Sequence, residues 1–201
     1  MKHNTMDINQ LAQRWTDMIA ASLEYGYIQD EIYKFRGHLD QKSWEQIGDL
    51  MSMNLLEKNL DIFEALNAHD FSMQIYSMAG SDAIVKKLAH QFELAKNYSD
   101  QGGLERKFSL YEEIVEETFP LIQIKTFEDM MHYFFTRALN RLAQLTQYWK
   151  GEEDAYPLWD RLASYAKTAN QEEKISTLHI ISNYAPWFVE QNQELFISIT
   201  N

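Results

Sequence analysis

Four glutamates within six residues stand out among the side chains that could do chemistry. The stretch is "LYEEIVEETFPLIQI", residues 110–124, and the four are Glu112, Glu113, Glu116 and Glu117. Paired carboxylates can serve as a general acid and a general base, but the two groups must then face each other across a cleft in different environments. Four carboxylates on one helix surface share one environment, so this pattern does not favour acid–base catalysis.

The same glutamates form two i, i+4 pairs of like charge on the predicted helix. Each pair costs roughly 0.2–0.5 kcal/mol of helix stability. Arg106 and Lys107 lie a turn or more before Glu112 and share none of its i, i+4 contacts, so we predict that the repulsion is largely unrelieved within the helix. An unrelieved acidic surface is typical of an electrostatic contact with a basic partner.

Further acids follow in the second half of the chain, namely Glu128, Asp129, Glu152, Glu153 and Asp154. Residues 1–100 and 101–201 each carry 9 basic and 15 acidic side chains, so the halves differ in clustering and not in net charge. We predict that these five acids and the four glutamates form a docking patch, with an ordinary solvated face as the alternative.

Composition excludes several classes of function. The formal charge is −12, which argues against a nucleic-acid surface or docking on anionic lipid, because both need clustered cations. The chain has no cysteine, which removes disulfides, thiolate nucleophiles and thiolate metal sites. The first residues, "MKHNTMDINQLAQRW", lack the apolar run of a secretion signal, and no stretch is long and apolar enough to span a bilayer, so we expect a cytoplasmic protein.

No known catalytic or metal-binding motif occurs. A di-metal helical bundle needs Glu-x-x-His, and the nearest spacings are Glu128-x-x-x-His132 and His90-x-x-Glu93. There is no Gly-x-Ser-x-Gly elbow, and the Gly-Ser and Gly-Gly loops lack the lysine of a phosphate-binding loop. We therefore predict no metal, no cofactor and no catalytic residue.

The aromatic residues predict a core and leave one surface candidate. The five tryptophans are spread one per predicted helix, as core anchors are, at Trp15, Trp44, Trp149, Trp159 and Trp187. Three aromatics in a row, residues 133–135, cannot all face one core stripe. His132 and Tyr133 could instead line a pocket between helices.

Apolar spacing is helical almost throughout, so the predicted fold is all-α, a single domain over residues 1–201 of eight or nine helices. Segments are predicted at 8–25, 40–67, 71–78, 82–98, 104–118, 126–149, 157–167, 171–184 and 186–199, with a short helical piece at 29–35. The loop at 99–103 is a possible division into two lobes. Capping side chains are predicted at Asp7, Asp40, Ser81, Thr126 and Asn170. The run "LIQIK" is predicted as an extended connector.

These features favour a binding protein over an enzyme. The most specific prediction is a bacterial immunity protein or antitoxin that covers the cationic surface of a basic nuclease toxin. One alternative is a helical enzyme, or a small-ligand or metal-binding protein, with a pocket between helices. The other is a helical scaffold or a subunit of an oligomer.

Overall fold

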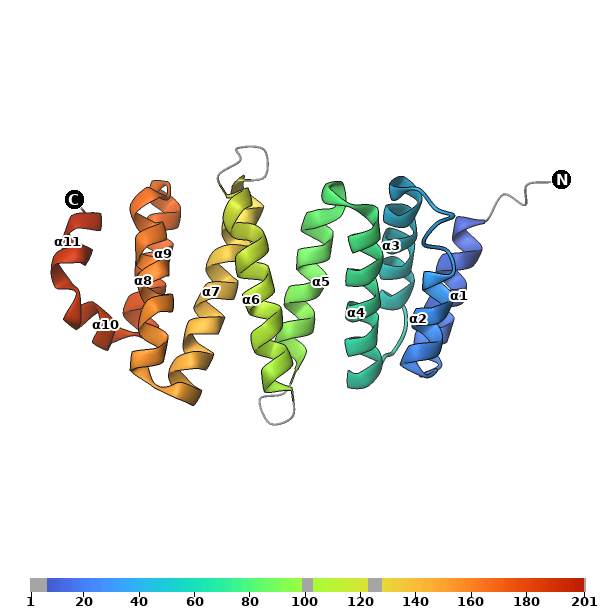
Figure 1. Cartoon of the computed structure of the whole chain (residues 1–201), viewed down its shortest axis with the longest axis horizontal. Helices are drawn as coiled ribbons and strands as arrows, with labels where there is room; N and C mark the ends of the chain where they lie inside the picture. Colours follow the sequence, from blue (N-terminus) through green and yellow to red (C-terminus); the bar gives the residue numbers. More distant parts are fainter. Residues whose placement is uncertain (1–6, 99–102, 123–127, 201) are drawn as a thin grey trace. The chain divides into compact units, whose positions relative to one another are not determined.

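The protein is all-α in the described part of its computed structural model, which covers residues 7–98, 103–122 and 128–200 (Figure 1). That part contains eleven α-helices and one 3-10 helix, more than the eight or nine predicted. Its contacts divide the chain into two units, residues 1–104 (unit 1) and 105–201 (unit 2). That residues 1–201 form a single domain stays a prediction. No helix in the described ranges is long and apolar enough to cross a membrane.

Unit 1 begins with α1 (Ile8–Ala20), α2 (Tyr25–Tyr33) and α3 (Gln41–Leu56). The predicted caps are confirmed: Asp7 accepts hydrogen bonds from the backbone of Asn9 and Gln10, and Asp40 accepts one from Ser43. Each carboxylate thus serves amide groups that have no partner within the first helical turn. The prediction that α1 extends to Gly26 is wrong, because Ser22 turns the chain with a φ of 50° and Gly26 lies inside α2.

The predicted long helix from Asp40 to Asn67 is also wrong, because it is two helices. α3 ends at Leu56, and α4 (Ile62–Ala79) starts at a capping box in which Asp61 and Glu64 bond each other's backbone N–H. This reciprocal cap stabilises a new helix start where the apolar spacing alone appears continuous.

The end of α4 was predicted correctly, and the start of the next helix was not. Gly80, with a φ of 85°, ends α4 as expected. Ser81, predicted to cap, begins the 3-10 helix η1 (Ser81–Ala83) and makes no side-chain cap bond; α5 (Ile84–Asn97) follows.

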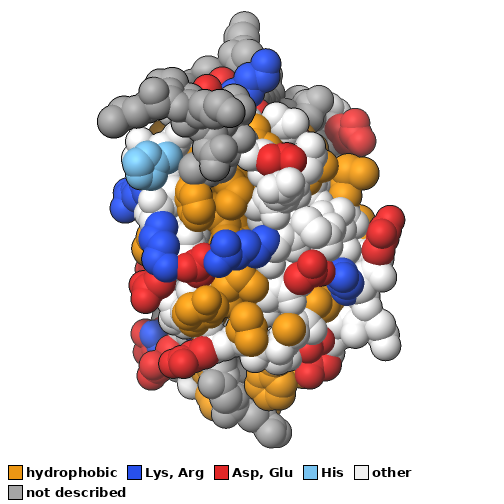
Figure 2. All heavy atoms as spheres, turned by 90° about the vertical axis from the view of Figure 1, so that its right-hand side faces the viewer, with side chains coloured by type: hydrophobic (Ala, Val, Ile, Leu, Met, Phe, Trp, Pro, Cys, Tyr) orange, Lys and Arg blue, Asp and Glu red, His pale blue; other side chains and the backbone are white. Residues whose placement is uncertain are grey.

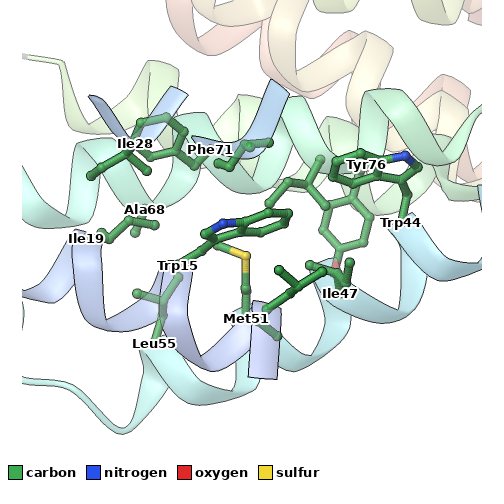
Figure 3. Close-up of a cluster of buried hydrophobic side chains, with 14 of the residues drawn as sticks. Trp15, Ile19, Ile28, Trp44, Ile47, Met51, Leu55, Ala68, Phe71 and Tyr76 are labelled. Atoms are coloured by element: carbon green, nitrogen blue, oxygen red, sulfur yellow. The ribbon is translucent and has the colours of Figure 1, made fainter. Parts of the chain in front are cut away.

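The core of unit 1 lies between α1, α2, α3 and α4 (Figure 3). Trp15 and Trp44 are buried and stacked, with ring centroids 6.0 Å apart. The cluster also contains Ile28 of α2, Met51 of α3 and Phe71 of α4. Burying a large apolar side chain contributes about 1.5–3 kcal/mol, so this cluster holds the first four helices together.

Unit 2 contains α6 (Leu104–Leu121), α7 (Glu128–Lys150), α8 (Glu152–Thr168), α9 (Gln171–Tyr184), α10 (Pro186–Gln191) and α11 (Gln193–Thr200). Asn170 caps α9 as predicted, accepting from the backbone of Glu173. The Thr126 cap and most of the "LIQIK" connector fall outside the described residues, although Leu121 is helical.

Three predicted helix boundaries in unit 2 are wrong. α6 runs past Pro120, because the fixed φ of proline suits a helix even though its ring removes one hydrogen bond. α8 begins at Glu152 and places Pro157 in its second turn, because Gly151 turns the chain directly after α7 with a φ of 102°. The predicted last helix is two, divided at Asn192, whose side chain bonds Tyr156 and the backbone of Phe188.

The core of unit 2 centres on α7 and α8. Phe135, Trp159 and Phe188 are fully buried, and the Trp159 indole donates a 3.0 Å hydrogen bond to Gln147. The prediction that every tryptophan is a core anchor holds for Trp15, Trp44 and Trp159. It fails for Trp149, which is 48% exposed near the end of α7.

Candidate functional site

The glutamate helix α6 is amphipathic, as its sequence predicts. Leu110, Ile114 and Val115 are buried. Glu112, Glu113 and Glu116 are exposed, and Glu117 is half-buried. The helix therefore presents carboxylates while its apolar side packs into unit 2.

The prediction that the like-charge repulsion is largely unrelieved within the helix is wrong for Glu113, which has Arg106 of the same helix beside it. Arg161 of α8 donates a 2.7 Å hydrogen bond to Glu116, and Arg106 lies 3.6 Å from Glu113, which also accepts from Ser109. One cation comes from a helix 45 residues later, and the other spans two turns of α6. Neither contact follows the i, i+4 spacing used for the prediction.

Arg161 connects α8 to α6 at one point. Besides bonding Glu116, the Arg161 guanidinium lies 4.7 Å from the ring centre of Phe119 of α6. Lys150, the last residue of α7, lies 5.6 Å from the ring centre of Phe108. The helices α6 and α8 run in the same direction (Figure 1). Residues at matching distances before Glu116 and Arg161 therefore lie at similar heights along the two helices.

Acids of both helices precede this contact along the chain. Glu112 precedes Glu116 by four residues, and Asp154 precedes Arg161 by seven, so each shares a helix face with its partner in the contact. The offset of three residues corresponds to about 4.5 Å along the axes. We call these acids the acidic face, namely Glu112, Glu113, Glu116 and Glu117 of α6 with Glu152, Glu153 and Asp154 of α8; that they form one surface stays a prediction.

The acids of α8 occupy its first turn, and all three are exposed. Gly151 gives this helix no side-chain cap, so the negative charges of Glu152, Glu153 and Asp154 favour the helix start through the dipole. In the described part of the chain, these three and Glu112 form no ion pair, unlike Glu113 and Glu116.

Glu128 and Asp129 are the remaining members of the predicted patch. Both begin α7, but their side chains lie outside what the structure describes. Their membership of the patch stays a prediction.

A second constellation, in unit 1, was not predicted from the sequence. His69 of α4 and His90 of α5 place their Nδ1 atoms 3.1 Å apart, and His90 Nε2 lies 3.2 Å from the Ser52 hydroxyl of α3. Ser52 lies 3.4 Å from the hydroxyl of Tyr76, which donates a 3.0 Å hydrogen bond to Asp49. Residues from three helices thus form one polar chain.

Electrostatics of this polar chain suit a structural role. Burial lowers the pKa of His69; burial, followed by the neighbouring His69, lowers the pKa of His90 to about 4. Burial also raises the pKa of Tyr76 to about 12. Both histidines are therefore neutral near pH 7, so no two like charges meet at 3.1 Å.

Each group in the polar chain donates its hydrogen bond to the next group in the direction of the Asp49 carboxylate. Because Tyr76 donates to Asp49, its oxygen accepts from Ser52, which in turn accepts from His90; the tautomers are assigned from these contacts. Lys86 donates to both oxygens of Asp49 at 2.8 Å and to Glu45 at 2.8 Å. With Ser52 donating away from His90, this is not the arrangement of an activated serine.

Metal ligation has little support in the described ranges. No group of three or more histidine, aspartate or glutamate side chains there is arranged to hold a metal ion. His90 and Glu93, spaced for a shared helix face, have other partners, His90 in the polar chain and Glu93 in an ion pair with Lys96.

A third constellation surrounds His132 in unit 2. Its Nδ1 lies 2.5 Å from the Tyr165 hydroxyl of α8, which also bonds Glu173 of α9 at 3.1 Å. His132 is buried, whereas Tyr133 is 48% exposed and is the one aromatic of residues 133–135 that turns away from the core. Both line a cavity of about 380 Å³ between α7 and α9. That this cavity binds a small ligand stays a prediction.

Comparison of the chain with family models, curated proteins and solved structures gives no match. The functional argument therefore depends on the geometry described above.

Proposed function

We propose that this chain is a binding protein that recognises a basic protein through the acidic face of unit 2. The observation that carries the proposal is the exposure of four carboxylates on α6 and the first turn of α8, namely Glu112, Glu152, Glu153 and Asp154. All four are exposed, and none forms an ion pair within the described ranges. Complementary charge of this kind speeds encounter with a cationic partner and fixes its orientation.

Arg161 gives the acidic face a defined shape. It bonds Glu116 and lies over Phe119, so it connects α8 to α6 while Glu112 and Asp154 stay exposed. A preorganised set of carboxylates costs less ordering entropy on binding than flexible ones. Such a set can act as a surrogate for the phosphates that a cationic surface otherwise binds.

The most specific form of the proposal is an immunity protein or antitoxin. A nuclease carries a cationic surface for its substrate, and a protein that presents carboxylates to that surface blocks it. The partner would then be a basic nuclease domain, and inhibition would follow from occlusion without any chemistry by this chain. A cytoplasmic location is part of this proposal.

The test uses the products of the reading frames next to this one. We expect one of them to be a basic protein that binds the wild-type chain and loses nuclease activity when bound. The variant Glu112→Gln/Glu152→Gln/Glu153→Gln/Asp154→Asn should inhibit it at least about tenfold less well, since several charge contacts are lost. The proposal is wrong if no basic product binds, or if the variant inhibits as well as the wild type.

A matched control changes net charge equally in unit 1. Glu24, Asp30, Glu57 and Asp82 are exposed on separate turns, and none makes an ion pair in the described part of the chain. Neutralising these four should leave inhibition unchanged, because the effect belongs to one surface and not to total charge.

A further inference from the structure

The cavity between α7 and α9 has the dimensions of a small-molecule site. Its volume is about 380 Å³, and its lining includes His132, Tyr133, Arg137, Glu172 and Glu173. Binding sites for small ligands typically measure about 300–1,000 Å³ and combine an apolar wall with a few fixed polar groups. This cavity belongs to different helix faces from the α6–α8 contact that builds the acidic face.

One wall of the cavity is fixed by hydrogen bonds, and the one between His132 and Tyr165 is buried. The Tyr165 hydroxyl connects His132 of α7 to Glu173 of α9, and the Asn170 side chain bonds the backbone of Glu173. His132 is only 7% exposed. Polar groups held in this way are preorganised for a ligand, because binding does not have to order them.

Opposite charges reach the cavity from its two helices. Arg137 of α7 is exposed, and its guanidinium lies 5.6 Å from the ring centre of Tyr133. Glu172 of α9 is exposed. In the ranges that the structure describes, neither side chain forms an ion pair, although both line the same cavity. Each therefore keeps its charge available to a ligand.

These charges define which ligand chemistry is complementary. A simple anion would meet Glu172 and Glu173 as well as Arg137, and a simple cation would meet Arg137. A molecule with one group of each sign satisfies both walls. A carboxylate is also the group that guanidinium binds best, through two parallel hydrogen bonds.

We propose that the cavity binds a small zwitterion of the α-amino-acid type, with its carboxylate on Arg137 and its ammonium group on Glu172. Tyr133 lies beside the carboxylate position, and Glu173 adds negative potential near the ammonium position. No covalent step is involved. The inference is independent of the acidic face, so either can fail without the other.

Isothermal titration of the full chain with individual free amino acids tests this site. We expect at least one to bind saturably at a single site at millimolar or lower concentration. Its decarboxylated amine and its deaminated acid should each bind about tenfold or more weakly, because each loses one charged hydrogen-bonding group. No saturable binding of any free amino acid, or tighter binding of either analogue, overturns the proposal.

Two variants assign the roles of the side chains. Arg137→Gln should abolish the preference for the amino acid over its decarboxylated amine, and Glu172→Gln the preference over the deaminated acid. Arg141→Gln, one turn further along α7 and outside the cavity lining, should change neither preference. A loss of packing alone would weaken all ligands equally, so unchanged preferences in Arg137→Gln and Glu172→Gln contradict the assignment.

Discussion

Carboxylates are used differently in the two units. In unit 1, Asp7, Asp40 and Asp61 cap helices, while Asp17, Glu31, Asp49 and Glu93 each contact a lysine or arginine. In unit 2, exposed carboxylates lie on α6 and at the start of α8; Glu113 and Glu116 contact an arginine, whereas Glu112, Glu152, Glu153 and Asp154 form no ion pair in the described residues. In the described part of unit 1 the exposed acids without an ion pair, such as Glu24 and Asp82, are spread along the chain, whereas in unit 2 three of them, residues 152–154, are adjacent.

The surface of unit 1 is consistent with this difference. Figure 2 views unit 1 from the side of α1 and α2, where acidic and basic side chains alternate with apolar ones. Glu31 of α2 contacts both Arg14 and Lys34, and the hydrogen bond from Lys34, more than the charge of Arg14, lowers the pKa of Glu31. The two halves of the chain have equal net charge, but their acidic residues are arranged differently. The acids of the second half are more clustered in the sequence.

Histidines show a parallel contrast. His90 of unit 1 belongs to a polar chain in which each group bonds the next, ending at Asp49 and Lys86. His132 of unit 2 bonds Tyr165 at the edge of a cavity. A satisfied internal chain stabilises helix packing, whereas fixed polar groups beside a cavity are suited to a ligand.

The largest expected effect is on the free energy of unfolding, and it tests whether the two units unfold independently. Trp15→Ala removes a fully buried indole from unit 1 and should lower its free energy of unfolding by about 3–5 kcal/mol. Hydrogen exchange followed by mass spectrometry should show faster exchange in α1 to α4 and unchanged exchange in α8. Equal acceleration in both units would support the predicted single domain instead.

An intermediate effect concerns acid stability. The pKa of His90 is lowered to about 4 in the folded protein from an ordinary 6.5, so the unfolded chain binds more protons between these values. Stability is therefore full above about pH 6.5 and falls as the pH drops toward 4, by about 1–2 kcal/mol between pH 7.5 and 5. Denaturant unfolding at several pH values measures this loss.

The variant His90→Gln isolates the contribution of that histidine. It removes the titrating group and should reduce the slope of stability against pH between 7.5 and 5, where most carboxylates remain ionised. His179→Gln, on the exposed side of α9, is the control and should keep the wild-type slope. An undiminished slope in His90→Gln would rule out the polar chain as the source of the acid sensitivity.

The smallest effect distinguishes paired from unpaired acids within the acidic face. Glu116→Gln should cost about 0.2–1 kcal/mol, the usual value of an exposed ion pair, because it breaks the contact with Arg161. Glu112→Gln should be neutral or slightly stabilising, since it removes one i, i+4 repulsion. Thermal unfolding at low salt compares the two, and a larger loss in Glu112→Gln would show that its charge is used internally.

The sequence was sufficient to predict helices and most of their caps. Asp7, Asp40 and Asn170 act locally, within three residues, so their roles can be read from spacing. The break at Asp61 was missed because apolar residues continue across it. Seeing Asp61 and Glu64 as a capping box would have located it.

The candidate sites could be predicted only where they are local. The glutamates of α6 are adjacent in sequence, so their clustering was visible. Their cation Arg161, and the chain from His69 through His90 to Ser52, depend on contacts between distant segments. Two histidines 21 residues apart carry no signal of contact in a single sequence.

The central claim is that the carboxylates of the acidic face guide a basic partner. Its most direct test is stopped-flow association with the basic neighbouring product at low and physiological ionic strength. Neutralising Glu112, Glu152, Glu153 and Asp154 should slow association about tenfold or more at low salt and flatten its salt dependence, since complementary charge acts mainly on the association rate. Neutralising the four matched acids of unit 1 should leave both unchanged. Equal slowing by the two variants, or none by the first, would contradict the claim.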